Sequence, residues 1–201
     1  MQITNCFASP IALFKNENFD LTDHCLRIKN KYNMTRAKIW IYSPYTSLTI
    51  SEKETGYNSL NDSNFSELIR WIQSCVDKFS KECGYFKMRL GNFWFNVYEK
   101  GDAQEFHNHP ESHVSCVYYA DVKDNDSKIL FQRNPMSMFP IPVFENNVYN
   151  CDQVWYKPEN GLLIVFKSDT MHMVERKVTD DIRISFSCNF NSTEESLDKT
   201  L

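Results

Sequence analysis

The spacing of apolar residues changes along the chain, from helical in the first half to alternating in the second. Apolar side chains recur at intervals of three and four residues at Phe65, Leu68, Ile69, Ile72, Val76 and Phe79. This spacing predicts an amphipathic helix, because such residues share one helical face. Capping candidates at 62–64 precede the helix and Gly84 follows its last turn. A shorter helix is expected at about 21–28, with Asp20 as a candidate cap.

From Phe86 onward the pattern has a period of two, and β-branched and aromatic residues dominate, which predicts strands. The expected strands are 85–100, 105–109, 112–122, 128–132, 153–156, 161–167, 172–175 and 181–191. Residues 134–150, which include three prolines, are expected to form a long loop. About eight strands behind helices predict a mainly β, α+β fold: a barrel or sandwich with one helical flank.

The 201 residues are enough for one well-buried core and too few for two, so we expect a single domain. Within it, a helical flank would occupy about 18–84, a β core about 85–191, and a polar tail 192–201. The apolar fraction of 42% is typical of a folded globular protein and does not suggest membrane spans.

Charge and cysteine usage exclude several classes of function. The net charge of −4, with scattered Lys and Arg, lacks the basic patch that binding a nucleic acid requires. The seven cysteines form no C-x-x-C pair, which argues against a disulfide framework or a thiolate zinc site. The opening residues do not resemble a signal peptide. Reduced thiols and a cytoplasmic location are therefore expected.

Three histidines form the first candidate site. His107 and His109 are separated by one residue in an expected strand, so both imidazoles would project from the same face. His172 follows a distant strand and could supply a third ligand to the same metal ion. Three protein ligands leave coordination positions open, as in catalytic sites. The alternative is a chance H-x-H on an exposed strand, with His172 a hydrogen-bonded core residue.

The last strand offers a candidate for anion binding. Between 181 and 191 the apolar residues alternate with Arg183, Ser185, Ser187 and Asn189. If this polar face lines a barrel, Arg183 points at the metal site with Ser185 beside it, and a guanidinium suits a carboxylate. The other interpretation is a solvent-facing polar side.

Asn96 and Tyr98 share one face of the long strand that leads into the H-x-H segment. The Tyr98 hydroxyl could donate to a bound acid, or Tyr98 could be an ordinary residue of an amphipathic strand.

These motifs, in this order, resemble the 2-oxoglutarate- and Fe(II)-dependent oxygenases, and within them a group found in marine bacteria and their phages. The similar segments are FASPI at 7–11, TGYNS at 55–59, WFNVYEKGDAQEFHNHPESHVSCVYYADV at 94–122, GLLIVFKSDTMHMV at 161–174 and RISFSCNF at 183–190. Most of the chain is covered, and 134–150 is the least recognisable part.

The resemblance implies a double-stranded β-helix, a jelly-roll or cupin-like core with the N-terminal helices packed on one face. It also implies that His107 and His172 ligate Fe(II), with His109 at the position of the third ligand. Arg183 and Ser185 would hold the distal carboxylate of 2-oxoglutarate, and Tyr98, with Asn96 beside it, would help to bind this cosubstrate. The implied activity is a dioxygenase that hydroxylates a peptidyl or small-molecule substrate with dioxygen and releases succinate.

One position departs from the family pattern. The residue two after the first histidine is usually Asp or Glu, whereas here it is His109. A neutral imidazole leaves the site one negative charge short, so zinc or another divalent ion becomes a credible occupant. Glu111 and His113 are alternative ligands near His107.

Two other classes of function fit the same residues. A three-histidine site could serve a hydrolase or a thiol dioxygenase without 2-oxoglutarate. A β-helix could also be a binding module without catalysis. An Arg183 that points into the barrel favours the 2-oxoglutarate-dependent dioxygenase, because neither of the two other classes needs it. The 134–150 loop could be a lid, a peptide groove or a contact in a homodimer.

Overall fold

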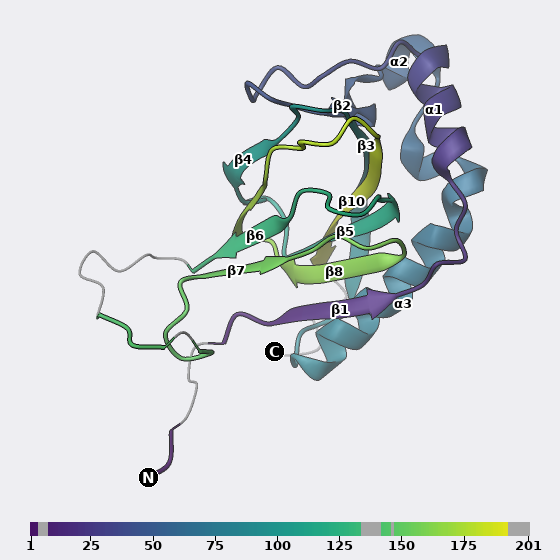
Figure 1. Ribbon diagram of the computed structural model, residues 1–201. Coiled ribbons are helices and arrows are strands. Elements are labelled where there is room, and N and C mark those ends of the chain that lie inside the picture. Colours follow the sequence, from purple (N-terminus) through teal and green to yellow (C-terminus); the bar gives the residue numbers. More distant parts are fainter. Residues whose placement is uncertain (4–7, 134–141, 146, 193–201) are drawn as a thin grey trace.

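The computed structural model describes residues 1–3, 8–133, 142–145 and 147–192. Two antiparallel sheets face each other, and helices cover the outer side of one of them (Figure 1). The larger sheet has the order β1-β8-β5-β10-β3-β2 and the smaller sheet the order β4-β9-β6-β7. The strands are β1 (Ile11–Lys15), β2 (Tyr45–Thr46), β3 (Met88–Tyr98), β4 (Gln104–His107), β5 (Val114–Asp121), β6 (Ile129–Gln132), β7 (Gln153–Tyr156), β8 (Leu162–Lys167), β9 (Met171–Val174) and β10 (Arg183–Ser192).

The chain passes repeatedly between the two sheets as it runs from β3 to β10. β3, β5, β8 and β10 belong to the larger sheet, while β4, β6, β7 and β9 belong to the smaller one. Such a path winds two antiparallel sheets into a double-stranded β-helix, a form of jelly roll. The expected fold class is therefore confirmed.

Three helices precede the β core in the chain: α1 (Thr22–Lys31), α2 (Glu52–Thr55) and α3 (Ser66–Glu82). The apolar stripe of α3 packs on the larger sheet, where Leu68 and Ile72 join one core with Phe93, Phe95 and Phe186. This confirms the long helix and its position on one face of the sheet. Gly84 ends it with a φ of +72°, a conformation that glycine adopts without strain.

The helix caps differ from the sequence prediction. α1 begins after Leu21, with no side-chain cap, so Asp20 is not its cap. Asp62 instead caps a short 3-10 helix, Ser63–Phe65, by accepting a hydrogen bond from the Asn64 backbone N–H. The turn continues into α3, whose N-cap position is Phe65. The capping signal marked the start of a helical segment, but not the first residue of the α-helix.

The eight expected strands are all present, and their ends differ from the prediction by at most three residues. One of these differences changes the argument about the metal site, because β4 ends at His107 and His109 lies beyond the strand. The sequence analysis missed two short strands, β1 and β2, which add one strand to each edge of the larger sheet. β1 precedes the predicted helical flank and β2 lies within it, and both are outside the segment with a period of two.

The polar face of β10 points into the barrel rather than to solvent. Arg183 and Ser185 are 1% and 2% exposed, while Ile184 and Phe186 on the other face pack under the helices. The solvent-facing interpretation is therefore wrong, because both faces of this strand are covered. Cys116 and Cys188 are buried, as expected for small apolar residues.

The expected loop 134–150 lies largely outside the described residues, as does the polar tail beyond 192. Within the part of the chain that is described, no helix is long and apolar enough to cross a membrane.

Candidate metal centre and anion pocket

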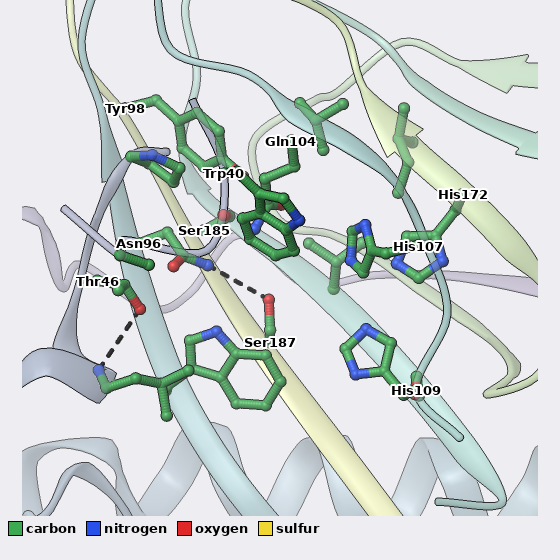
Figure 2. Close-up of a pocket in the computed structure, with 18 of the residues that line it drawn as sticks. Trp40, Thr46, Asn96, Tyr98, Gln104, His107, His109, His172, Ser185 and Ser187 are labelled. Carbon is green, nitrogen blue, oxygen red and sulfur yellow. Dashed lines mark hydrogen bonds between the residues drawn. The ribbon is translucent and has the colours of Figure 1, made fainter. Parts of the chain in front are cut away.

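A single pocket between the two sheets is lined by every candidate site residue. His107, His109, His172, Arg183, Ser185, Tyr98 and Asn96 all line it. Figure 2 shows the three histidines on one side of this pocket and Tyr98, Asn96 and Ser185 on the other, with Trp40 between them. The three histidines and the inward-facing Arg183 therefore line one and the same cavity.

The three histidines form a cluster because two neighbouring strands of the smaller sheet deliver them. β4 and β9 are antiparallel, and His107 is directly opposite His172 in their register. His109 follows the end of β4, where its backbone N–H donates to the carbonyl of Ser168 at 2.9 Å. One ligand nitrogen from each ring lies within 4.8 Å of the others. Three bonds of about 2.1 Å to one ion need nitrogens roughly 3 Å apart, so small ring rotations suffice.

Backbone carbonyls orient two of the rings. Nδ1 of His107 is 2.7 Å from the carbonyl oxygen of Glu105, and Nδ1 of His172 is 3.0 Å from that of Thr170. An Nδ1–H that donates to a carbonyl leaves Nε2 as the lone-pair nitrogen, available to a metal. Both imidazoles are therefore held in the tautomer that a metal ligand requires.

The environment also keeps the rings neutral. Burial lowers the pKa of His172 to about 3, with a further contribution from His107. Burial and then the proximity of His107 lower the pKa of His109 to about 4. The pKa of His107 is lowered by burial as well. At neutral pH all three rings are thus unprotonated, as metal coordination demands.

The candidate ligands Glu111 and His113 lie apart from this cluster. The group of potential ligands found among the described residues contains neither of them. Both are exposed, and Nδ1 of His113 is 3.1 Å from Oδ1 of Asn191.

Arg183 reaches the same pocket from the first position of β10. Its Nη1 donates to Oδ1 of Asp126 at 3.2 Å and to the carbonyl and hydroxyl oxygens of Ser127 at 2.9 Å each. Its Cζ lies 3.9 Å from the centre of the Tyr98 ring. Nε is buried and has no hydrogen-bond partner among the described residues. A buried donor without a partner is costly, so this edge of the guanidinium is suited to an anionic ligand.

A second buried cation, Lys177, fixes the carboxylate that orients Arg183. Nζ of Lys177 is 3.1 Å from Oδ2 of Asp126 and 2.6 Å from Oδ1 of Asp181. The side chains of Lys177 and Asp126 are fully buried. Asp126 therefore bridges two cations, and its charge is shared between them.

Three uncharged groups complete the polar side of the pocket. The Tyr98 hydroxyl donates to Oε1 of Gln104 at 2.6 Å, and burial raises the pKa of Tyr98 to about 12. Nδ2 of Asn96 donates weakly to the Ser187 hydroxyl, at 3.5 Å. The Ser185 hydroxyl group belongs to a residue that lines the pocket and is only 2% exposed.

Sequence reasoning missed several residues that shape the pocket: Trp40, Gln104, Asp126, Ser127 and Lys177. Trp40 lies in the N-terminal half, with its ring centroid 4.9 Å from that of His107. Asp126 and Lys177 are in two separate connections between strands, and the pattern of strands does not predict that these connections meet. Gln104 is on β4 three residues before His107, so a regular period of two would put it on the opposite face. The register of β4 is irregular between these two residues, and both line the pocket.

Comparison with known proteins agrees with these observations. Residues 92–189 match the model of a family described as "Putative 2OG-Fe(II) oxygenase". No curated protein matches the chain by sequence.

Solved structures share the fold at low sequence identity. A Pseudomonas putida prolyl-4-hydroxylase is 13% identical, with a TM-score of 0.61 over 92% of this chain and 94% of its own. A Trichoplax adhaerens prolyl hydroxylase, solved with a hypoxia-inducible-factor peptide, is 12% identical, with a TM-score of 0.60 over 95% and 87%. The epimerase SnoN, solved with Fe3+, α-ketoglutarate and nogalamycin RO, is 11% identical, with a TM-score of 0.63 over 92% and 79%.

These likenesses establish the double-stranded β-helix, and the family match covers β3 to β10, the part that contains the histidine cluster and Arg183. The region from 92 to 189 is therefore similar to the 2-oxoglutarate- and Fe(II)-dependent oxygenases, a family of oxidoreductases.

Proposed function

We propose that this protein is a dioxygenase that hydroxylates a C–H bond of a peptidyl or small-molecule substrate. In the proposed reaction one oxygen atom of O2 enters the substrate as a hydroxyl group. The other enters succinate, as 2-oxoglutarate loses CO2. The family match over residues 92–189 supports this reaction, and the residues that line the pocket include candidates to hold the metal and the cosubstrate.

In this proposal His107, His109 and His172 are the iron ligands. The donor set fits a divalent ion: three neutral imidazoles converge, and backbone carbonyls fix the tautomer of two of them. Bound Fe(II) would supply the redox chemistry with dioxygen. The residues of the protein orient the ion and leave part of its coordination sphere open to the pocket, since three ligands do not saturate iron.

Arg183 would hold the distal carboxylate of 2-oxoglutarate, and this supports the proposal most directly. A buried guanidinium with an unpaired Nε lines the same pocket as the imidazoles. Ser185, two residues along β10 on the same face, offers a hydroxyl group to the same pocket. Tyr98 lies against the guanidinium, and Asn96 completes this polar wall.

The electrostatics of the pocket are consistent with a dianionic cosubstrate despite the third imidazole. Three neutral ligands leave the 2+ charge of a bound ion uncompensated, and 2-oxoglutarate carries two negative charges. An Asp or Glu at position 109 would make the loaded centre one unit more negative. His109 should therefore strengthen the binding of the cosubstrate to the metal, while weakening the binding of the metal itself.

A three-histidine hydrolase or thiol dioxygenase would use the same cluster without a cosubstrate. Neither activity requires a buried Arg183 with a donor free for an anion. The environment of Arg183 therefore favours the dioxygenase that uses 2-oxoglutarate.

The direct test is anaerobic addition of Fe(II) and 2-oxoglutarate to the metal-free protein. Chelation of iron by the 2-oxo acid should produce a visible charge-transfer band. Arg183→Gln should weaken 2-oxoglutarate binding at least tenfold, and Arg70→Gln, on the exposed surface of α3, should leave it unchanged. Because Arg183→Gln removes a buried charge, Ser185→Ala provides a milder second variant, with an expected loss of about threefold. A protein that binds Zn(II) tightly but shows no band with Fe(II) would contradict the proposal.

A further inference from the structure

The pocket has an aromatic part beside the metal cluster. Two indoles flank it: the Trp40 ring centroid lies 4.9 Å from that of His107, and the Trp94 centroid 6.0 Å from that of His109. Leu48 lines the same pocket and is 64% exposed, so it lies at the pocket's mouth. We call the part lined by Trp40, Trp94 and Leu48 the indole slot.

The indole slot is held in place by the protein rather than by a ligand. Trp40 belongs to a segment that Arg36 and Asp102 pin through an ion pair, while Arg36 also donates to the carbonyl of Ser43 at 2.8 Å. The backbone N–H of Ala103 donates to the carbonyl of Tyr42 at 2.8 Å. Trp94 is 8% exposed on β3, where its partner in the register is Ser187. Both indoles are therefore anchored beside the metal cluster before any substrate arrives.

The charge of the pocket limits what can enter this slot. Arg183 is the only Lys, Arg, Asp or Glu residue among the described residues that line the pocket. The three histidines are neutral, because their pKa values are lowered. If Arg183 holds the cosubstrate, no charged side chain remains near the slot to compensate a second ion. Moving an uncompensated carboxylate or ammonium into such a site is unfavourable, because the ion loses its hydration without gaining a partner.

The surface around the mouth of the pocket is apolar as well. Ile39 and Leu48 line the pocket and are 75% and 64% exposed. Large aliphatic side chains in one exposed group indicate a surface that contacts an apolar ligand. The polar group nearest to Trp94 on the neighbouring strand is the Ser187 hydroxyl, which can hydrogen-bond a neutral atom of the substrate.

We propose that the indole slot binds an uncharged, apolar part of the substrate, a hydrocarbon ring or chain, and presents its C–H bond to the metal. Trp40 and Trp94 are the specificity-determining residues, and Ser187 hydrogen-bonds a neutral polar atom beside the reacting carbon. This proposal rests on the proposed function, because it assigns Arg183 to the cosubstrate.

The test uses the protein loaded anaerobically with Fe(II) and 2-oxoglutarate, so that binding is measured without turnover. The probes are three molecules with the same ring: cyclohexanecarboxamide, cyclohexanecarboxylate and cyclohexylmethylammonium. Saturation-transfer NMR titrations should show at least tenfold tighter binding of the carboxamide than of either ion. Trp40→Ala and Trp94→Leu should each weaken carboxamide binding at least fivefold and leave the 2-oxoglutarate charge-transfer band intact. Ile41→Ala, in the same segment but outside the pocket lining, is the matched control and should change neither.

A charge introduced into the slot provides a second, independent variant. Ser187→Asp should reverse the preference, so that cyclohexylmethylammonium binds more tightly than cyclohexanecarboxylate by at least tenfold. Equal binding of the neutral and charged probes with the band present would overturn this inference alone. Absence of the band would overturn the proposed function and, with it, the assignment of Arg183 on which the inference depends.

Discussion

The guanidinium of Arg183 lies against the aromatic ring of Tyr98, with Cζ 3.9 Å from the ring centre. Both side chains are almost fully buried, at 1% and 2% exposure, on strands β10 and β3, where the two residues are direct partners in the register. The ring supports the cation from one side while Asp126 and Ser127 hold Nη1. The proposed anchor for the cosubstrate is thus built by the sheet itself, and this relationship can be tested.

Replacement of Tyr98 should separate the role of its ring from that of its hydroxyl. Tyr98→Phe keeps the ring under Arg183 and loses the 2.6 Å hydrogen bond to Gln104, so 2-oxoglutarate binding should weaken only about threefold. Tyr98→Leu removes the cation–π contact, worth about 1–2 kcal/mol when desolvated, and should weaken binding about tenfold or more. Titration of the charge-transfer band measures both. Equal losses in the two variants would show that the ring does not matter.

The three clustered histidines should dominate metal affinity. Substitution of His107, His109 or His172 by Ala should each reduce Fe(II) or Zn(II) affinity by at least about 100-fold, because each removes one of three ligands. His113→Ala is the control: its ring is exposed and outside the cluster, so affinity should change less than twofold. Competition with a chelator gives the constants. Full affinity in His109→Ala would exclude the third imidazole as a ligand.

Metal affinity should depend only weakly on pH in the mildly acidic range. The pKa values of His109 and His172 are lowered to about 4 and about 3, mainly by burial, so these rings bind few protons at pH 6. Protons then compete with the metal only at lower pH, and affinity at pH 6.0 should stay within about threefold of that at pH 7.5. Three ordinary imidazoles with pKa values near 6.5 would instead lose roughly 50-fold over this range. A loss of that size would contradict the neutral, buried cluster.

The buried carboxylate that Lys177 and Arg183 share should be important for stability. Asp126→Asn leaves two buried cations with less compensation and should lower the free energy of unfolding by about 3–5 kcal/mol. Lys100→Met removes an exposed cation that pairs with Asp180 and should change it by less than about 1 kcal/mol. Urea denaturation of the metal-free variants measures both. A small effect of Asp126→Asn would mean that water or another group compensates the two cations.

The sequence predicted the second half of the chain well because its strands have a strict period of two. Ile184 and Phe186 pack under the helices while Arg183 and Ser185 line the pocket. Periodicity alone could not say which face was enclosed. A face that looks solvent-exposed in one sheet becomes interior when a second sheet covers it, and this depends on contacts between distant strands.

The candidate site was predicted residue by residue, but for His109 the reason given was wrong. The argument placed His107 and His109 on one strand face, whereas β4 ends at His107 and His109 is positioned by the backbone of Ser168. Trp40 and Lys177 were missed altogether. Trp40 lines the pocket and Lys177 acts on it through Asp126, both from irregular segments that no periodic pattern or motif connects to a site.

The proposed dioxygenase must hold one ion and one dicarboxylate in the pocket between His172 and Arg183. A crystal structure of the protein prepared anaerobically with Fe(II) and 2-oxoglutarate, with anomalous data at the iron edge, tests this most directly. The expected result is iron at about 2.1 Å from a nitrogen of His107, His109 and His172, with the distal carboxylate of 2-oxoglutarate hydrogen-bonded to Arg183. Iron bound away from these rings, or a cosubstrate that leaves Nε of Arg183 without a partner, would contradict it.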